Sequence, residues 1–169
     1  ENECRLLLAT GYQADAPAAV RYPRGTGTGA PVSDGLETVA IGKGIIRHQG
    51  EKTAFIAFGS MVAPALTVAE KLNATVADMR FVKPIDEELI IHLAQSHDYI
   101  VSAEENAEQG GAGSAVLEVL AKHGICKPVL LLGVADTVTE HGDPKKLLDD
   151  LGLSAEAMEK RIRGWLPAA

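Results

Sequence analysis

Long apolar runs and concentrated positive charge are both missing from this chain. No apolar run approaches the roughly 18 residues that a membrane span needs, and no charged leader before an apolar stretch indicates a signal peptide. The 16 Lys and Arg are interspersed with 23 Asp and Glu, for a formal net charge of −7. Binding to nucleic acid needs clustered cations that release the counterions of the polyanion. The sequence therefore predicts a soluble, cytoplasmic protein that binds no membrane and no nucleic acid.

The sequence is also poor in the residues and motifs that most often identify a catalytic or metal site. Its two cysteines, Cys4 and Cys126, are far apart and have no CxxC or histidine partner at metal-ligand spacing, so we expect reduced thiols. His92 and His97 lie about 140° apart around a helix, which is too far to share a metal. No GxSxG, HExxH or P-loop motif occurs. We expect His48, His123 and His141, which stand near predicted turns or helix ends, to be solvated or capping residues.

The first 35 residues differ in character from the rest. Residues 2–10 have the spacing of a helix that ends near Gly11, and residues 18–22 are typical of a short apolar strand. Residues 25–35 are rich in glycine and contain a proline, which is the composition of a linker. Because the chain starts with Glu1 inside a helical pattern, we expect it to be the end of a longer protein.

Apolar strand-like segments then alternate with helix-like segments. Strands are expected over residues 41–47, 53–58, 74–79, 98–103 and 129–132. Ser60 is the expected N-cap of the first helix between them, Pro84 and Asp86 open the next, and Asp143 caps a later one. Strands that are apolar throughout and joined by helices indicate a parallel sheet covered on both faces. The predicted fold class is α/β, with a mostly parallel sheet and helices on both faces.

A glycine-rich turn follows the strand at residues 98–103. Residues 104–114 precede a helix, and ligands in open α/β sheets gather at such strand ends. The turn lacks the third glycine of the dinucleotide fingerprint, however. We therefore expect its small residues to allow close packing of the helix, rather than to bind a nucleotide.

Two arginines stand out in the heptapeptide AVRYPRG. Arg24 and Arg21 are three residues apart, and Pro23 restricts the backbone between them. The planar guanidinium group keeps its charge and donates hydrogen bonds in pairs, which suits a phosphate group. An alternative is that either arginine pairs with an acidic neighbour and only stabilises a domain junction. The residues alone leave both interpretations open.

The motifs taken in order resemble a known family. AVRYPRG, IGKG, FGSMVAPAL, ADMRFVKPID, SAEENAEQGGAGS and EHG follow one another as in the carboxyl-terminal portion of the bacterial 1-deoxy-D-xylulose 5-phosphate synthases, which are transketolase-like enzymes. The resemblance covers essentially the whole chain. Residues 136–139 depart from it, because the family usually has bulkier apolar residues there.

The resemblance implies a specific enzyme. Such synthases use thiamin diphosphate and Mg²⁺ to decarboxylate pyruvate and join the two-carbon unit to glyceraldehyde 3-phosphate, for isoprenoid, thiamin and pyridoxal synthesis, and they work as homodimers. Residues 1–30 would be the end of the pyrimidine-binding domain and the start of the linker, and residues 31–169 the transketolase C-terminal domain. Arg24 would hold the aldehyde phosphate, and Arg21 is a weaker candidate. The resemblance places the catalytic, cofactor and metal residues upstream, so we expect this chain alone to be inactive.

Two alternatives stay open. Close relatives of the RYPRG motif also occur in the beta subunits of 2-oxo-acid dehydrogenases, which share the transketolase-like fold. A detached C-terminal domain could also be a non-catalytic dimerisation or assembly module.

Overall fold

The computed structural model describes residues 1–23, 25, 27 and 29–167. Its centre is a five-stranded sheet with the order β1-β3-β2-β4-β5. The strands are β1 (Ile45–His48), β2 (Glu51–Ala57), β3 (Ala74–Asp78), β4 (Tyr99–Ala107) and β5 (Val129–Val134). The helices are α1 (Asn2–Gln13), α2 (Val62–Leu72), α3 (Glu87–Ser96), α4 (Ala112–Lys122), α5 (Pro144–Asp150) and α6 (Ala155–Trp165), and a short 3₁₀ helix, η1 (Gly59–Met61), precedes α2.

The predicted α/β fold with a mostly parallel sheet is confirmed. Strands β2, β3, β4 and β5 run parallel, and β1 pairs with β3 in the antiparallel direction at one edge. The central strands are apolar at successive positions because both of their faces are covered. In β2, Phe55 belongs to one core cluster and Ile56 to the other, and both are fully buried.

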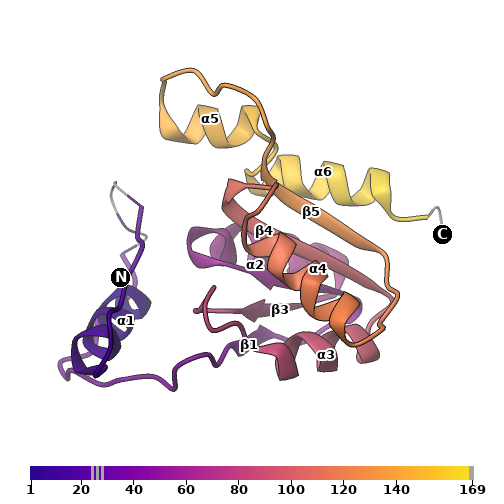
Figure 1. Ribbon diagram of the computed structural model, residues 1–169. Helices are drawn as coiled ribbons and strands as arrows, with labels where there is room; N and C mark the ends of the chain where they lie inside the picture. Colours follow the sequence, from indigo (N-terminus) through magenta and orange to yellow (C-terminus); the bar gives the residue numbers. More distant parts are fainter. Residues whose placement is uncertain (24, 26, 28, 168–169) are drawn as a thin grey trace.

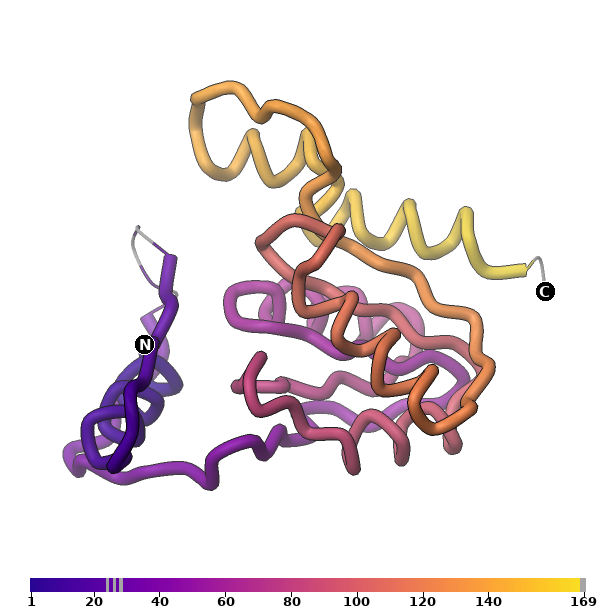
Figure 2. The backbone as a smooth tube through the Cα atoms, viewed as in Figure 1, coloured from indigo at the N-terminus to yellow at the C-terminus, as the bar shows by residue number. Residues whose placement is uncertain are grey.

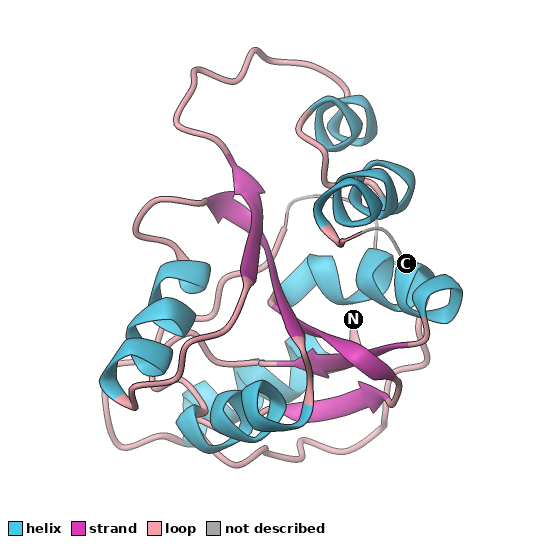
Figure 3. Ribbon diagram, turned by 90° about the vertical axis from the view of Figure 1, so that its right-hand side faces the viewer, coloured by secondary structure: helices cyan, strands magenta, loops and turns pink. Residues whose placement is uncertain are grey.

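Helices cover both faces of the sheet (Figure 3). On one face, Val68 of α2 and Ile162 of α6 are in the cluster that contains Phe55. On the other face, Ile90 of α3 and Val116 of α4 are in the cluster that contains Ile56. Full burial of such a side chain contributes about 1.5–3 kcal/mol, so these two apolar layers are the main source of the domain's stability.

Several helix ends follow the sequence signals. The Asp86 carboxylate accepts a hydrogen bond from the Leu89 amide at the start of α3, and Asp143 caps α5 by accepting from the amides of Lys145 and Lys146. None of the helices in the described ranges is long and apolar enough to cross a membrane.

The N-terminal part lies beside the sheet rather than within its layers. Helix α1 lies beyond the carboxyl ends of the parallel strands, and an extended segment leads from it to β1 (Figures 1 and 2). The helix continues past Gly11 to Gln13, so its predicted end was too early. The strand predicted over residues 18–22 is wrong, because this segment pairs with no strand in the described part of the chain.

Candidate functional site

The predicted phosphate-binding segment lies near the carboxyl end of β4. The Arg21 side chain donates a hydrogen bond from Nη2 to the main-chain oxygen of Glu105, at 3.3 Å. Its guanidinium group therefore contacts a main-chain carbonyl at the carboxyl end of β4. Arg24, the other predicted site residue, lies outside the described residues.

Ser60 contributes to the same edge in an unexpected way. The prediction that it caps α2 is wrong, because the N-cap of α2 is Met61 and no side chain caps it. Gly59 has a φ of 58° and begins η1, which leads into α2. This turn carries Ser60 to the end of β4, where its hydroxyl donates a hydrogen bond to Glu105 Oε2 at 2.5 Å. Glu105 is thus contacted through its side chain by Ser60 and through its backbone by Arg21.

Glu104 occupies the place where an anion would bind at the start of α4. Its side-chain oxygens accept hydrogen bonds from the amides of Ala112, at 2.9 Å, and Gly113, at 2.8 Å, and the residue is only 5% exposed. A helix N-terminus attracts negative charge through exactly such amides. Because the chain's own carboxylate takes them, the geometry opposes a nucleotide or diphosphate site at this turn.

The close packing predicted for the glycine-rich turn is confirmed. A Cβ atom on Gly111 would collide with the carbonyl oxygen of Ala107 and with the Glu104 carboxylate, and one on Gly113 would lie 2.9 Å from Ser102 Oγ. The absence of side chains at these positions lets α4 begin directly against β4. The same contacts explain why the Ser102 hydroxyl is buried, and it has no hydrogen-bond partner among the described residues.

A second structured turn follows β3 and reaches α1. Arg80 has a φ of 56°, and its amide donates to Asp78 Oδ1 at 3.1 Å. Its side chain donates from Nε to Glu3 Oε2 and from Nη2 to Glu3 Oε1, each at 2.8 Å. Burial raises the pKa of the Asp78 carboxyl, the Glu3 carboxylate raises it further, and the hydrogen bond from the Arg80 amide opposes both.

The histidines are not gathered into a site. His97 Nε2 lies 2.7 Å from Thr75 Oγ1, His123 Nε2 lies 3.1 Å from Glu87 Oε2, and His141 is exposed. No three His, Cys, Asp or Glu side chains within the described ranges are grouped so as to hold a metal ion.

Two open surface cavities lie elsewhere on the domain. One, of about 430 Å³, lies beside the ion pair between Glu108 and Arg161, and the other, of about 220 Å³, lies beside His92 and His97. Arg21 lines neither cavity.

Four of the residues that shape this end of the sheet were not predicted from the sequence as site residues. Glu105 and Ser60 are 45 positions apart, and Arg80 and Glu3 are 77 positions apart, so no local pattern pairs them. Arg80 stands within the ADMRFVKPID motif that supported the family resemblance. That motif was the one signal that could have drawn attention to it.

Comparison with known proteins defines the class first. Residues 42–158 match the family described as "Transketolase, C-terminal domain". The match covers more than half of the chain, and the chain belongs to this family.

Comparison with individual proteins gives relatives of one named enzyme. The chain is 89% identical over 167 residues to the 1-deoxy-D-xylulose-5-phosphate synthase of Neisseria gonorrhoeae (strain NCCP11945), which covers 99% of this chain and 26% of that protein. It is 56% identical to the synthase of Thiobacillus denitrificans (strain ATCC 25259 / T1), over 99% of this chain and 27% of that protein. The resemblance stated from the sequence is therefore confirmed. The chain spans about a quarter of the length of these curated relatives.

A solved structure supports the fold. The chain resembles a split gene transketolase, described as an inactive beta4 tetramer, with a TM-score of 0.70 and 36% identity over 75% of this chain and 43% of that one.

Proposed function

We propose that this chain is the C-terminal part of a 1-deoxy-D-xylulose 5-phosphate synthase. The observation that carries the proposal is the 89% identity to such a synthase over 99% of the chain. In this proposal, residues 1–30 end the pyrimidine-binding domain and begin the linker, and residues 31–169 form the C-terminal domain. The whole protein is a cytoplasmic homodimer that joins pyruvate and glyceraldehyde 3-phosphate to form 1-deoxy-D-xylulose 5-phosphate with loss of CO₂.

Thiamin diphosphate and Mg²⁺ would belong to other parts of that protein. The described residues do not fit either group, because they form no acidic or histidine cluster for the metal and Glu104 already takes the amides at the start of α4. When bound, the thiamin group would supply the carbanion chemistry. We therefore assign no catalytic, cofactor-binding or metal-binding residue to this chain, and we expect it to be inactive alone.

The contribution of this chain to substrate binding would be Arg24. A guanidinium group binds a phosphate through paired, charge-assisted hydrogen bonds. Arg21, three residues earlier, holds the segment to the sheet edge through the Glu105 carbonyl. This contact supports a role for Arg21 in placing the segment, with Arg24 as the group that binds the aldehyde phosphate.

The test uses the full-length synthase that carries this chain. Arg24→Ala should raise KM for glyceraldehyde 3-phosphate roughly 10- to 100-fold, as expected for the loss of a charge-assisted contact, and should change KM for pyruvate little. Arg5→Ala is the matched control, because Arg5 donates to the Asp34 carbonyl within the same N-terminal part. Equal effects on both substrates would remove the phosphate role. If the protein consumed another 2-oxo acid and formed no deoxyxylulose phosphate, it would be a dehydrogenase beta subunit instead.

A role in assembly is the second candidate function. The structural neighbour, described as an inactive beta4 tetramer of a split gene transketolase, favours it. Sedimentation of residues 36–169 would test it, and a strictly monomeric species would exclude self-association through this domain.

A further inference from the structure

Polar contacts join the described residues of the N-terminal part to the α/β domain. They include the ion pair between Glu3 of α1 and Arg80, and the hydrogen bond from Arg21, which follows α1, to the Glu105 carbonyl. Both reach the end of the sheet that faces α1 (Figure 1). These side chains therefore help to place the N-terminal part against the domain.

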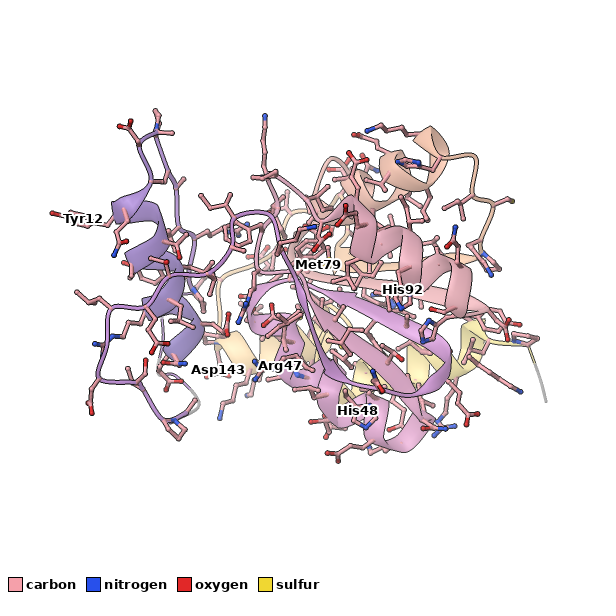
Figure 4. The ribbon with its side chains drawn as sticks, turned by 90° about the horizontal axis from the view of Figure 1, so that it is seen from below. Tyr12, Arg47, His48, Met79, His92 and Asp143 are labelled. Carbon is pink, nitrogen blue, oxygen red and sulfur yellow. The ribbon has the colours of Figure 1, made fainter. Side chains whose placement is uncertain are left out.

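The ion pair is built to fix an orientation. Both carboxylate oxygens of Glu3 accept hydrogen bonds from the Arg80 guanidinium group at 2.8 Å, and the Arg80 side chain is only 13% exposed. Arg47 lies on the side of the domain that faces α1 (Figure 4) and approaches Glu3 Oε1 at 3.8 Å. A bidentate pair adds geometric specificity as well as energy. The Asp78 carboxylate accepts from the Arg80 amide and so holds the turn from which the fork projects.

Helix α1 in turn contacts the residues that lead into Arg21. A Cβ atom built on Gly11 would lie 3.3 Å from Ala18 Cβ and 3.4 Å from Val20 Cγ2. The side chains of Ala18 and Val20, just before Arg21, therefore pack against α1 at Gly11. A shift of α1 must move Arg21, and with it the start of the segment that leads to Arg24.

We propose that Arg80 is a positioning residue for substrate binding. Its paired hydrogen bonds to Glu3 set the placement of α1 at the carboxyl end of the sheet, and α1 sets the placement of Ala18 and Val20, which lead into Arg21. The role rests on the proposed phosphate contact of Arg24, because Arg80 acts on substrate only through that segment.

Hydrogen exchange on the full-length synthase that carries this chain tests the structural part. Arg80→Gln should make the amides of α1 and of residues 18–22 exchange about tenfold faster, and Arg80→Lys, which keeps the charge but not the fork, should give an intermediate effect. Glu3→Gln should have an effect that does not add to that of Arg80→Gln. Lys71→Gln is the control, because it breaks a 2.7 Å pair with Glu159 that joins α2 to α6. If Arg80→Gln left α1 as protected as this control does, the proposal would be overturned.

Steady-state kinetics of the full-length synthase test the functional part. Arg80→Gln should raise KM for glyceraldehyde 3-phosphate about three- to tenfold with little change for pyruvate, and Arg80→Lys should restore part of the loss. In an Arg24→Ala background, Arg80→Gln should have no further effect, because no phosphate contact is left to misplace. An additive loss would contradict positioning. If Arg24→Ala itself showed no selectivity for the aldehyde, the proposed function would fail, and the exchange result would still decide whether Arg80 places α1.

Discussion

Different interactions stabilise the α/β domain and the N-terminal part, residues 1–41. The domain buries apolar side chains on both faces of its sheet, and many of them are completely inaccessible. In the described residues of the N-terminal part, only Leu6, Ala9 and Thr10 are buried. Hydrogen bonds stabilise this part, and in one of them the Val39 amide donates to the Thr10 hydroxyl at 2.9 Å.

This difference indicates what each part can do. Apolar layers define a single packing arrangement and resist local opening. Polar contacts at the carboxyl end of the sheet orient the N-terminal part but contribute little to the free energy of unfolding. Removing one partner of such a contact changes the structure mainly nearby.

Removal of a central core side chain should give the largest loss. Phe55 is completely buried in β2, and Phe55→Ala should lower the free energy of unfolding by about 3–5 kcal/mol. Tyr12→Ala is the counterpart in α1, where the side chain is 93% exposed and points away from the domain (Figure 4), and it should change stability by less than about 0.5 kcal/mol. Urea denaturation of both variants measures the contrast. Similar losses would show that the two parts are not held differently.

Two glycines should respond in opposite directions. Gly111→Ala places a Cβ atom against the Ala107 carbonyl and the Glu104 carboxylate, and should destabilise by about 1–3 kcal/mol. Gly164→Ala adds a Cβ atom in open space within α6, and should stabilise by about 0.5–1 kcal/mol because alanine favours a helix. Thermal and urea denaturation measure both. A neutral Gly111→Ala would mean that α4 does not need its close approach to β4.

Local signals predicted most of the domain. The apolar runs gave β2 and β3 nearly in full, and Asp86 and Asp143 marked their helices, because capping and strand burial depend on neighbouring residues. Strand β4 was predicted to end at residue 103 but continues to Ala107, which pairs with Val134 of β5. Its last residues are polar, and only the neighbouring strand makes them a strand.

The sheet edge could be predicted only in part. Arg21 was identified from the type of its side chain, but its partner Glu105 is 84 positions away. The apolar residues 18–22 suggested a strand, yet a strand needs a neighbouring strand, and the described part of the chain places none there. Long-range pairs such as Arg80 with Glu3 depend on the completed topology, and no local pattern encodes them.

The smallest predicted effect lies at the boundary between the two parts. Burial, and then Glu3, raises the pKa of Asp78 above its ordinary value of 3.8. The folded state then binds more protons than the unfolded chain, so ionisation of Asp78 lowers the free energy of unfolding as pH rises from that ordinary value through the raised pKa. Asp78→Asn should therefore become more stable relative to wild type over this range, with no trend at lower pH. Urea denaturation at a series of pH values measures this difference. In a Glu3→Gln background the trend should weaken but persist, because burial is the larger cause, and a difference that did not vary with pH would contradict the assignment.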